Sequence, residues 1–171
     1  MNTQTKSRVA VVTGGARGIG RAIGEWFLRH GYKVALIDRD RETLDHTAAD
    51  LAQPDTLLAV HCDVSDKAQV ERAAADVLAK FGRVDALVNN AGVAVFKPAL
   101  ETSFEEWRTV MGTNLDGAFL CTQVFGGLMA GNGGGAVVNV ASISGLRAST
   151  LRVAYGTSKA ALIHLMRQQA A

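Results

Sequence analysis

The sequence predicts an α/β fold, a doubly wound parallel sheet with at least five strands. Short apolar runs rich in β-branched residues alternate along the chain with segments of helical period. These runs lack the polar alternation of half-exposed strands, and residues 34–37 are apolar throughout, as expected of strands buried on both faces. A glycine-rich turn follows the first run directly and opens a helical segment.

The composition indicates a folded chain and excludes several classes of protein. The 171 residues are 48% hydrophobic and 20% charged, the opposite of a disordered chain. The net charge of +2 is spread along the sequence without a basic run, so no nucleic-acid partner is expected. No stretch approaches the roughly 18 apolar residues of a membrane span. No signal-peptide pattern is present, and Cys62 and Cys121 are too few for a disulfide framework, so we expect a cytoplasmic protein.

The pattern of apolar residues places the elements in order along the chain. Strands are expected at residues 8–13, 33–38, 56–61, 84–89 and 136–141. Two of the helical segments between them carry apolar stripes, formed by Ile19, Ala22, Ile23, Trp26 and Phe27 and by Val70, Ala74, Val77, Leu78 and Phe81. Ser103 and Glu106 form a capping box that opens a helix running to about residue 130. The last helix begins near Tyr155 and continues to the final residues.

The turn after the first strand has the chemistry of a phosphate-binding loop. It runs from Thr13 to Gly20 and reads Thr-Gly-Gly-Ala-Arg-Gly-Ile-Gly. Glycine permits positive φ and the close approach of a phosphate, and the first turn of the following helix offers unpaired N–H groups. The spacing differs from the common Gly-x-Gly-x-x-Gly fingerprint, and a plain strand-to-helix turn is the alternative. The strand-turn-helix context favours a Rossmann-like dinucleotide site formed by Gly14, Arg17, Gly18, Ile19 and Gly20.

Asp38 ends the second strand, 18 positions after Gly20. A carboxylate there can accept hydrogen bonds from both hydroxyls of the adenosine ribose, and it would repel a 2′-phosphate. The sequence therefore favours NAD over NADP as the cofactor. Arg17 and Arg39 could bind a phosphate, so NADP stays open as the alternative. Asp38 could also be only the polar residue that closes a strand.

Four further motifs follow in order along the chain. Cys62-Asp63-Val64 comes after the third strand, Asn89-Asn90-Ala91-Gly92 after the fourth, then Asn114, and finally Ser142 with Tyr155-x-x-x-Lys159. Together with the glycine turn, they resemble the classical short-chain dehydrogenase/reductase family from about residue 8 to the end of the sequence. The resemblance implies a nicotinamide-dependent oxidoreductase acting on an alcohol/carbonyl pair, commonly a dimer or tetramer.

The resemblance also implies roles for the matching residues. Asp63 would contact the adenine with the backbone of Val64 beside it, and Asn90 would support the central part of the cofactor. Lys159 would bond the nicotinamide ribose, and Asn114 would anchor a water relay to it. The matching positions of the catalytic tetrad are Asn114, Ser142, Tyr155 and Lys159. Asp63 could instead cap the following turn, and Asn114 could be a satisfied buried amide.

The spacing of Tyr155 and Lys159 supports this assignment independently. Residues four apart share one face of a helix, and a nearby cation favours the phenolate form of a tyrosine. Tyr155 could then take the hydroxyl proton during oxidation and return it during reduction. Ser142 lies just beyond the fifth strand, at the edge where ligands bind in such sheets, and can hydrogen-bond the reacting oxygen. Ser144 is the rival for that role.

We therefore expect an NAD-dependent enzyme whose small-molecule substrate is a secondary alcohol or ketone. An NADPH-dependent 3-oxoacyl or carbonyl reductase of the same family is the alternative within enzymes. A non-catalytic dinucleotide-binding fragment is the alternative outside them. No metal is expected, because the four histidines lack the spacing of a zinc site.

Residues 1–171 are expected to form one NAD(P)-binding domain. Family members continue beyond the last helix, so we expect the chain to lack a C-terminal substrate-binding portion and to leave residues 136–141 as an open edge strand. The two long helices carry more apolar residues than one side of a sheet needs, which predicts a homodimer or homotetramer. The residues expected in that contact are Phe119, Phe125, Leu128, Met129, Leu162, Leu165 and Met166.

Overall fold

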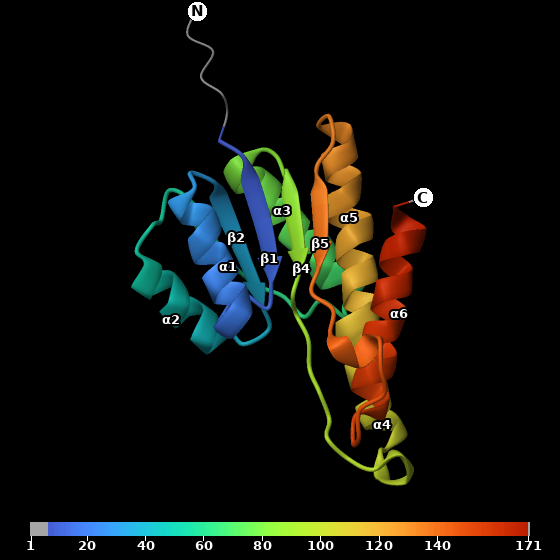
Figure 1. The fold of residues 1–171 in the computed structure, drawn as a ribbon. Helices are drawn as coiled ribbons and strands as arrows, with labels where there is room; N and C mark the ends of the chain where they lie inside the picture. The colour runs from blue at the N-terminus through green and yellow to red at the C-terminus, as the bar shows by residue number, and fades with distance from the viewer. Residues whose placement is uncertain (1–6, 171) are drawn as a thin grey trace, which may run out of the picture.

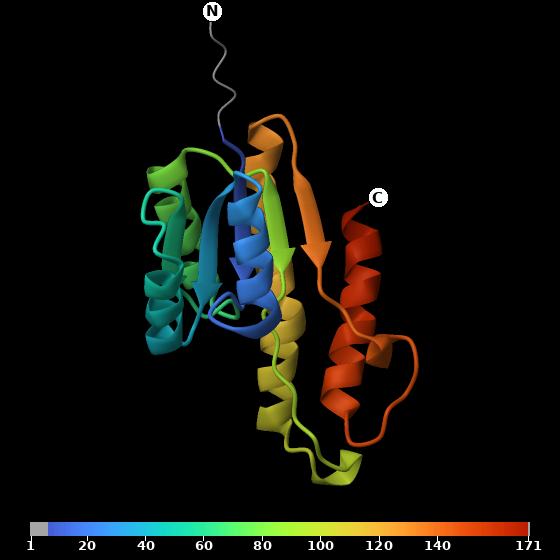
Figure 2. The same ribbon diagram turned by 60° about the vertical axis from the view of Figure 1, so that its left-hand side comes forward.

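The computed structural model describes residues 7–170, which form one parallel sheet with helices packed on both faces (Figures 1 and 2). The strand order is β3-β2-β1-β4-β5, and every pair is parallel. The strands are β1 (Val9–Thr13), β2 (Lys33–Asp38), β3 (Leu57–His61), β4 (Ala86–Asn89) and β5 (Ala136–Asn139). The predicted doubly wound sheet is confirmed, and its switch point lies between β1 and β4.

The central strand explains why the apolar runs do not alternate. All five residues of β1 are buried, and Val11 pairs with Ala35 on one side and Leu87 on the other. The helices α1 (Gly18–Arg29) and α2 (Arg41–Leu51) cover one face of the sheet, and α3 (Lys67–Phe81) and α5 (Gly117–Gly131) cover the other. Side chains that point to either face of β1 are therefore removed from water.

The edges of the sheet differ from its centre. β5 is an edge strand of the described sheet, and its Val137 and Val138 are 36% and 55% exposed. The helix α6 (Val153–Gln169) follows β5 and packs mainly against the short helical turn Ile143–Gly145, α4 (Phe104–Met111) and the segment Gly112–Asp116. None of the helices within residues 7–170 is both long and apolar enough to cross a bilayer.

The prediction for the buried face of α1 is wrong only in part, because Ile23 and Phe27 of the predicted stripe are half-buried and pack against the core. Ile19 and Trp26 are 65% and 49% exposed, although they belong to the predicted apolar stripe. The face that meets the sheet includes Gly20 and Gly24 instead. A Cβ added at Gly24 would lie 2.6 Å from a methyl carbon of Leu36, so the backbone of α1 approaches β2 too closely for a large side chain. Helical period identified the helix, but close packing decided its face.

The long helix begins as predicted but contains an irregularity. The capping box is formed, because Ser103 Oγ accepts from the Glu106 amide at 3.2 Å and the Glu106 carboxylate accepts from the Ser103 amide at 2.9 Å. After α4 the chain passes through a π-helical segment, Gly112–Asp116, into α5. Such π segments occur frequently at functional sites, and this one contains Asn114.

The predicted subunit-contact residues divide into three groups, of which one, Leu128 and Leu165, is half-buried. Phe125, Met129 and Leu162 are almost fully buried within the chain itself, so they are core residues and the prediction is wrong for them. Phe119 and Met166 are 44% and 43% exposed. Long apolar helices supply both core and surface, and sequence period does not distinguish the two.

Candidate active site

The glycine turn joins the carboxyl end of β1 to α1 at the switch point of the sheet. Gly14 and Gly18 have positive φ angles of 65° and 57°, which other residues rarely adopt. A Cβ at Gly20 would collide with the carbonyl oxygen of Gly14, while one at Gly18 would meet open space. Arg17, at the N-cap position of α1, makes no side-chain capping bond, so its side chain leaves the first-turn amides free for another acceptor. The turn therefore has the geometry of an anion cradle.

A cavity of about 300 Å³ opens beside this turn, at the carboxyl edge of the sheet. The predicted residues that line it are Gly14, Arg17, Ile19, Asp38, Asp63, Val64 and Asn90. Other lining residues are Ile37, Arg39, Cys62, Ala91, Gly92, Val93 and Thr113. Gly18 and Gly20 support the turn without lining the cavity. Within residues 7–170, no group of three or more His, Cys, Asp or Glu side chains could hold a metal ion.

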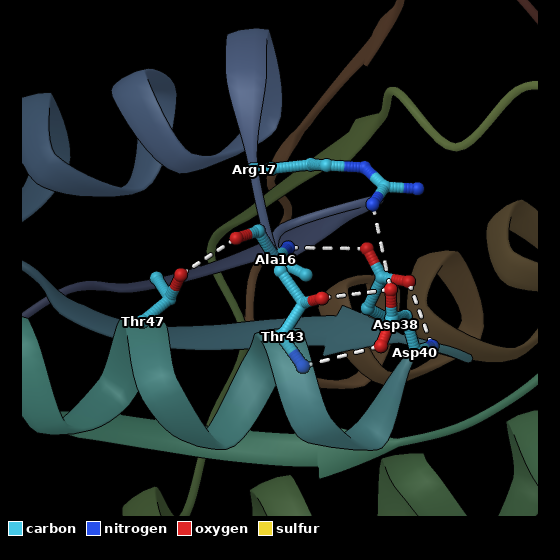
Figure 3. A network of polar contacts seen from close by, with 6 residues as sticks. All are labelled: Ala16, Arg17, Asp38, Asp40, Thr43 and Thr47. Carbon is cyan, nitrogen blue, oxygen red and sulfur yellow. Dashed lines mark hydrogen bonds and ion pairs between the residues drawn. The ribbon is translucent and has the colours of Figure 1, made fainter.

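The carboxylate of Asp38 accepts two backbone hydrogen bonds, one of them from the glycine turn (Figure 3). One carboxylate oxygen accepts from the Ala16 amide at 3.1 Å, and the other accepts from the Asp40 amide at 3.0 Å. The carboxylate thus lies on the cavity wall with its orientation defined by the backbone of two elements. Arg17 reaches across the same wall to Asp40, with 3.4 Å between guanidinium and carboxylate.

Asn90 ties the ends of β1 and β4 together. Its side-chain amide donates to the carbonyls of Thr13 at 2.9 Å and Gly14 at 3.1 Å. The hydroxyl of Thr13 accepts from the amides of Asn90 and Ala91, both at 3.0 Å. Sequence reasoning missed Thr13 as a site residue, and its only signal was a polar residue closing an otherwise apolar strand. The two residues hold the turn and the β4 loop at a fixed separation.

Asp63 lines the cavity and also shapes the turn after β3. Its Oδ1 accepts from the amide of Ser65 at 2.9 Å and from its hydroxyl at 2.7 Å. The alternative that Asp63 caps this turn is therefore confirmed, while α3 itself is capped by Asp66. Because Asp63 also lines the cavity, it can contact a ligand there as well.

Asn114 is a buried, fully bonded amide that joins two segments. Its Oδ1 accepts from the Val93 amide at 2.8 Å, and its Nδ2 donates to the Val93 carbonyl and the Ser158 hydroxyl, both at 3.0 Å. Asn114 thus links the loop after β4 to α6. Sequence reasoning missed Ser158, whose signal was its place beside Lys159 on the same helix. The described contacts of Asn114 do not include Lys159.

Lys159 and Tyr155 lie together on α6, as their spacing predicts. The ammonium nitrogen of Lys159 is 5.9 Å from the centroid of the Tyr155 ring and donates to the Val140 carbonyl at 2.7 Å. Lys159 is only 4% exposed, and this burial lowers its pKa. A buried cation held beside a phenol is the arrangement that a proton-transferring tyrosine needs.

Ser142 occupies the extended backbone immediately before a short helical turn, Ile143–Gly145. Its hydroxyl oxygen accepts from the Ser144 amide at 3.1 Å. Ser142 is half-buried, whereas its rival Ser144 is 6% exposed. Accessibility therefore favours Ser142 for contact with a ligand.

None of the four catalytic candidates lines the cavity, but Asn114 and Lys159 lie close to one of its lining residues. Asn114, Ser142, Tyr155 and Lys159 are absent from its lining, whereas Gly92 belongs to it. A Cβ added at Gly92 would lie 3.4 Å from the Asn114 carbonyl oxygen and 3.7 Å from the Lys159 nitrogen. Gly92 therefore lies between the cavity and the buried ammonium of Lys159.

Fold and site together define a Rossmann-like nucleotide-binding protein. The profile of the family described as short chain dehydrogenase matches residues 8–171, and the chain belongs to that family. It is 41% identical over 165 residues to a D-threitol dehydrogenase from Mycolicibacterium smegmatis, covering 96% of this chain and 64% of that protein. It is 39% identical over 158 residues to an NAD-dependent glycerol dehydrogenase from Listeria innocua, covering 92% and 61%.

A solved structure agrees with this assignment. A short chain dehydrogenase/reductase from Burkholderia phymatum in complex with NAD superposes with a TM-score of 0.92 and 36% identity, covering 96% of this chain and 59% of that chain. The present chain spans about three fifths of the length of the curated relatives named above.

Proposed function

We propose that this protein is an NAD-dependent oxidoreductase that transfers a hydride between the cofactor and a secondary alcohol or ketone, with Tyr155 as the general acid and base. The observation that carries the proposal is the buried ammonium of Lys159 beside Tyr155 and behind Gly92, at the boundary of the glycine-turn cavity. Membership of the short chain dehydrogenase family supports it, as do relatives named for oxidation of threitol and glycerol.

The residues around the cavity fit a dinucleotide. The glycine turn, with positive φ at Gly14 and Gly18, and the first turn of α1, which Arg17 does not cap with its side chain, suit a pyrophosphate. Both present backbone N–H groups to an anion. Asp38 would accept bonds from the adenosine ribose, and Asp63 with Val64 would border the adenine. When bound, the nicotinamide supplies the hydride chemistry.

The chain itself supplies the proton transfer. Tyr155, with the ammonium of Lys159 held near its ring, would accept the proton of an alcohol during oxidation and return it during reduction. Ser142 would donate a hydrogen bond to the reacting oxygen. Asn114 is a positioning residue. Its side chain bonds to Val93, in the loop after β4, and to Ser158, which precedes Lys159 on α6, so it holds the two segments together.

The preference for NAD rests on Asp38. Its carboxylate is oriented by the amides of Ala16 and Asp40, so it presents a fixed negative charge on the cavity wall. The uncharged hydroxyls of a ribose can donate to it, while a 2′-phosphate would be repelled. Arg17 and Arg39 also line the cavity and favour the second candidate, an NADPH-dependent reductase of the same family. The ratio of kcat/KM for the two cofactors discriminates between the candidates.

Substitution of Tyr155 by Phe tests the proposed chemistry. The change removes only the hydroxyl, so we expect turnover to fall by about 10²- to 10⁴-fold while NADH affinity, measured by fluorescence titration, stays within twofold. Tyr32→Phe is the matched control, because Tyr32 is the other tyrosine and its hydroxyl meets only an exposed Arg8 in the described contacts. Wild-type turnover in Tyr155→Phe would show that the assigned role is wrong.

A further inference from the structure

Arg17 and Asp38, which carry opposite charges, line the same cavity. Arg17 lies within the glycine turn, so it offers a cation to a 2′-phosphate at the place where Asp38 offers repulsion. In the structure the guanidinium does not stand free. It extends to the carboxylate of Asp40, at 3.4 Å (Figure 3). The charge of Arg17 is therefore already compensated by an acid from another element.

Asp40 is a partly exposed acid whose carboxylate is held in place by hydrogen bonds. It is the N-cap of α2, and its carboxylate accepts from the Thr43 amide at 3.1 Å and from the Thr43 hydroxyl at 2.8 Å. Its own amide donates to Asp38 at 3.0 Å. The Thr43 hydrogen bonds, assisted by Arg17, lower the pKa of Asp40, so it is ionised at neutral pH.

A second contact holds α2 against the glycine turn. The hydroxyl of Thr47, one turn further along α2, donates to the carbonyl of Ala16 at 2.6 Å and is buried. Ala16 immediately precedes Arg17, and Asp40 immediately precedes α2. The backbone of Arg17 is therefore held near the start of α2 by this contact, and Figure 3 shows the Arg17 side chain extending toward Asp40.

We propose that Asp40 is a specificity-determining residue that acts through Arg17 and makes the site reject a 2′-phosphate. This inference rests on the proposed NAD-dependent function. A 2′-phosphate would have to draw Arg17 away from Asp40 and would leave that carboxylate uncompensated beside Asp38. The ribose hydroxyls of NAD carry no charge and require neither change. The preference for NAD thus comes in part from an arginine that is paired with Asp40 and so is not available to a 2′-phosphate.

The test separates the 2′-phosphate from the rest of the nucleotide. Calorimetric titration compares 5′-AMP with adenosine 2′,5′-bisphosphate in wild type and in Asp40→Asn. Asparagine is as good an N-cap as aspartate, so the helix start is retained while the charge is lost. We expect affinity for the bisphosphate to rise roughly tenfold, about 1.4 kcal/mol, and affinity for 5′-AMP to stay within about twofold. The gain should shrink at high salt, because the charges are exposed.

Further variants identify the route of the effect. In an Arg17→Gln background, Asp40→Asn should give less than half of its tenfold gain, because the engaged cation is gone. Asp66→Asn is the matched control, since Asp66 caps α3 by the same kind of bond to Gln69 and lies outside the cavity lining. Asp40→Ser provides a second capping side chain without the charge, and thermal unfolding of both Asp40 variants checks that the fold is retained.

Two results would overturn the inference, and they are distinct from failure of the proposed function. An unchanged affinity ratio in Asp40→Asn would show that Asp40 does not discriminate. A full tenfold gain in the Arg17→Gln background would show that Asp40 does not act through the arginine. If wild type binds neither nucleotide, the dinucleotide site itself is wrong, and this inference fails with it.

Discussion

Replacement of Asn114 by Ala tests whether this buried amide holds the site together. The change removes both polar atoms of a side chain that is 1% exposed. The Val93 amide and carbonyl lose their bonds to it, and the Ser158 hydroxyl keeps only its bond to the Tyr155 carbonyl. Three hydrogen bonds at about 1 kcal/mol each give an expected loss of about 3 kcal/mol in the free energy of unfolding. Turnover should fall as well, because the Val93 loop and α6 lose their link.

Denaturant unfolding measures the predicted loss of stability. The change should appear as a lower midpoint with an unchanged m-value, because the surface exposed on unfolding is nearly the same. Asn132→Ala is the matched control: Asn132 is exposed at the end of α5, so the same chemical change should cost less than about 0.5 kcal/mol. A loss below about 1 kcal/mol for Asn114→Ala would refute the reasoning, since the bridging bonds would then contribute no net stability.

Two further predictions concern charged groups of the site. Burial lowers the pKa of Lys159 in the folded state below 10.5, its ordinary value, which it regains in the unfolded chain. At a pH between the folded-state and unfolded-state pKa, the unfolded chain therefore binds more protons than the folded one. The free energy of unfolding should rise with pH across that window. Lys159→Met should be more stable than wild type at neutral pH by a margin that narrows as pH rises through the window, while turnover and NADH affinity fall; a margin independent of pH in unfolding measurements would contradict this. Asp38→Ala removes both ribose acceptors and the repulsion of a 2′-phosphate, so kcat/KM for NADP relative to NAD should rise about tenfold or more. An unchanged ratio from initial rates would show that Asp38 is not the discriminator.

Local sequence was sufficient for the elements of the fold and for the frame of the site. The strands, the glycine turn and the Ser103–Glu106 capping box depend on residues within a few positions of one another. Gly14 and Gly18 were expected at positions of special backbone conformation, and both have positive φ. Parallel strands bring their carboxyl ends to one edge, so the order of the motifs already placed Asp38, Asp63 and Asn90 around one cavity.

Packing decided what helical period could not. The period of α1 pointed to Ile19 and Trp26 as buried, because large apolar side chains usually fill an interface. The sheet instead approaches the helix at Gly24, where Leu36 leaves no room for a Cβ, and Ile19 and Trp26 are exposed. The same limit applies to Phe125 and Leu162, which fill the core although a subunit contact was expected of them.

The charges and amides of the site were decided by contacts between residues far apart in the sequence. Arg17 and Asp40 are 23 positions apart, and Asn114 bonds to partners 21 and 44 positions away. Such partners are set by the register of the strands and by the docking of α2 and α6, which no local pattern encodes. The sequence alone determined which chemical groups the site contains. Tertiary structure decided which of them are already engaged, because a charge or amide acts on a ligand only with what its neighbours leave free.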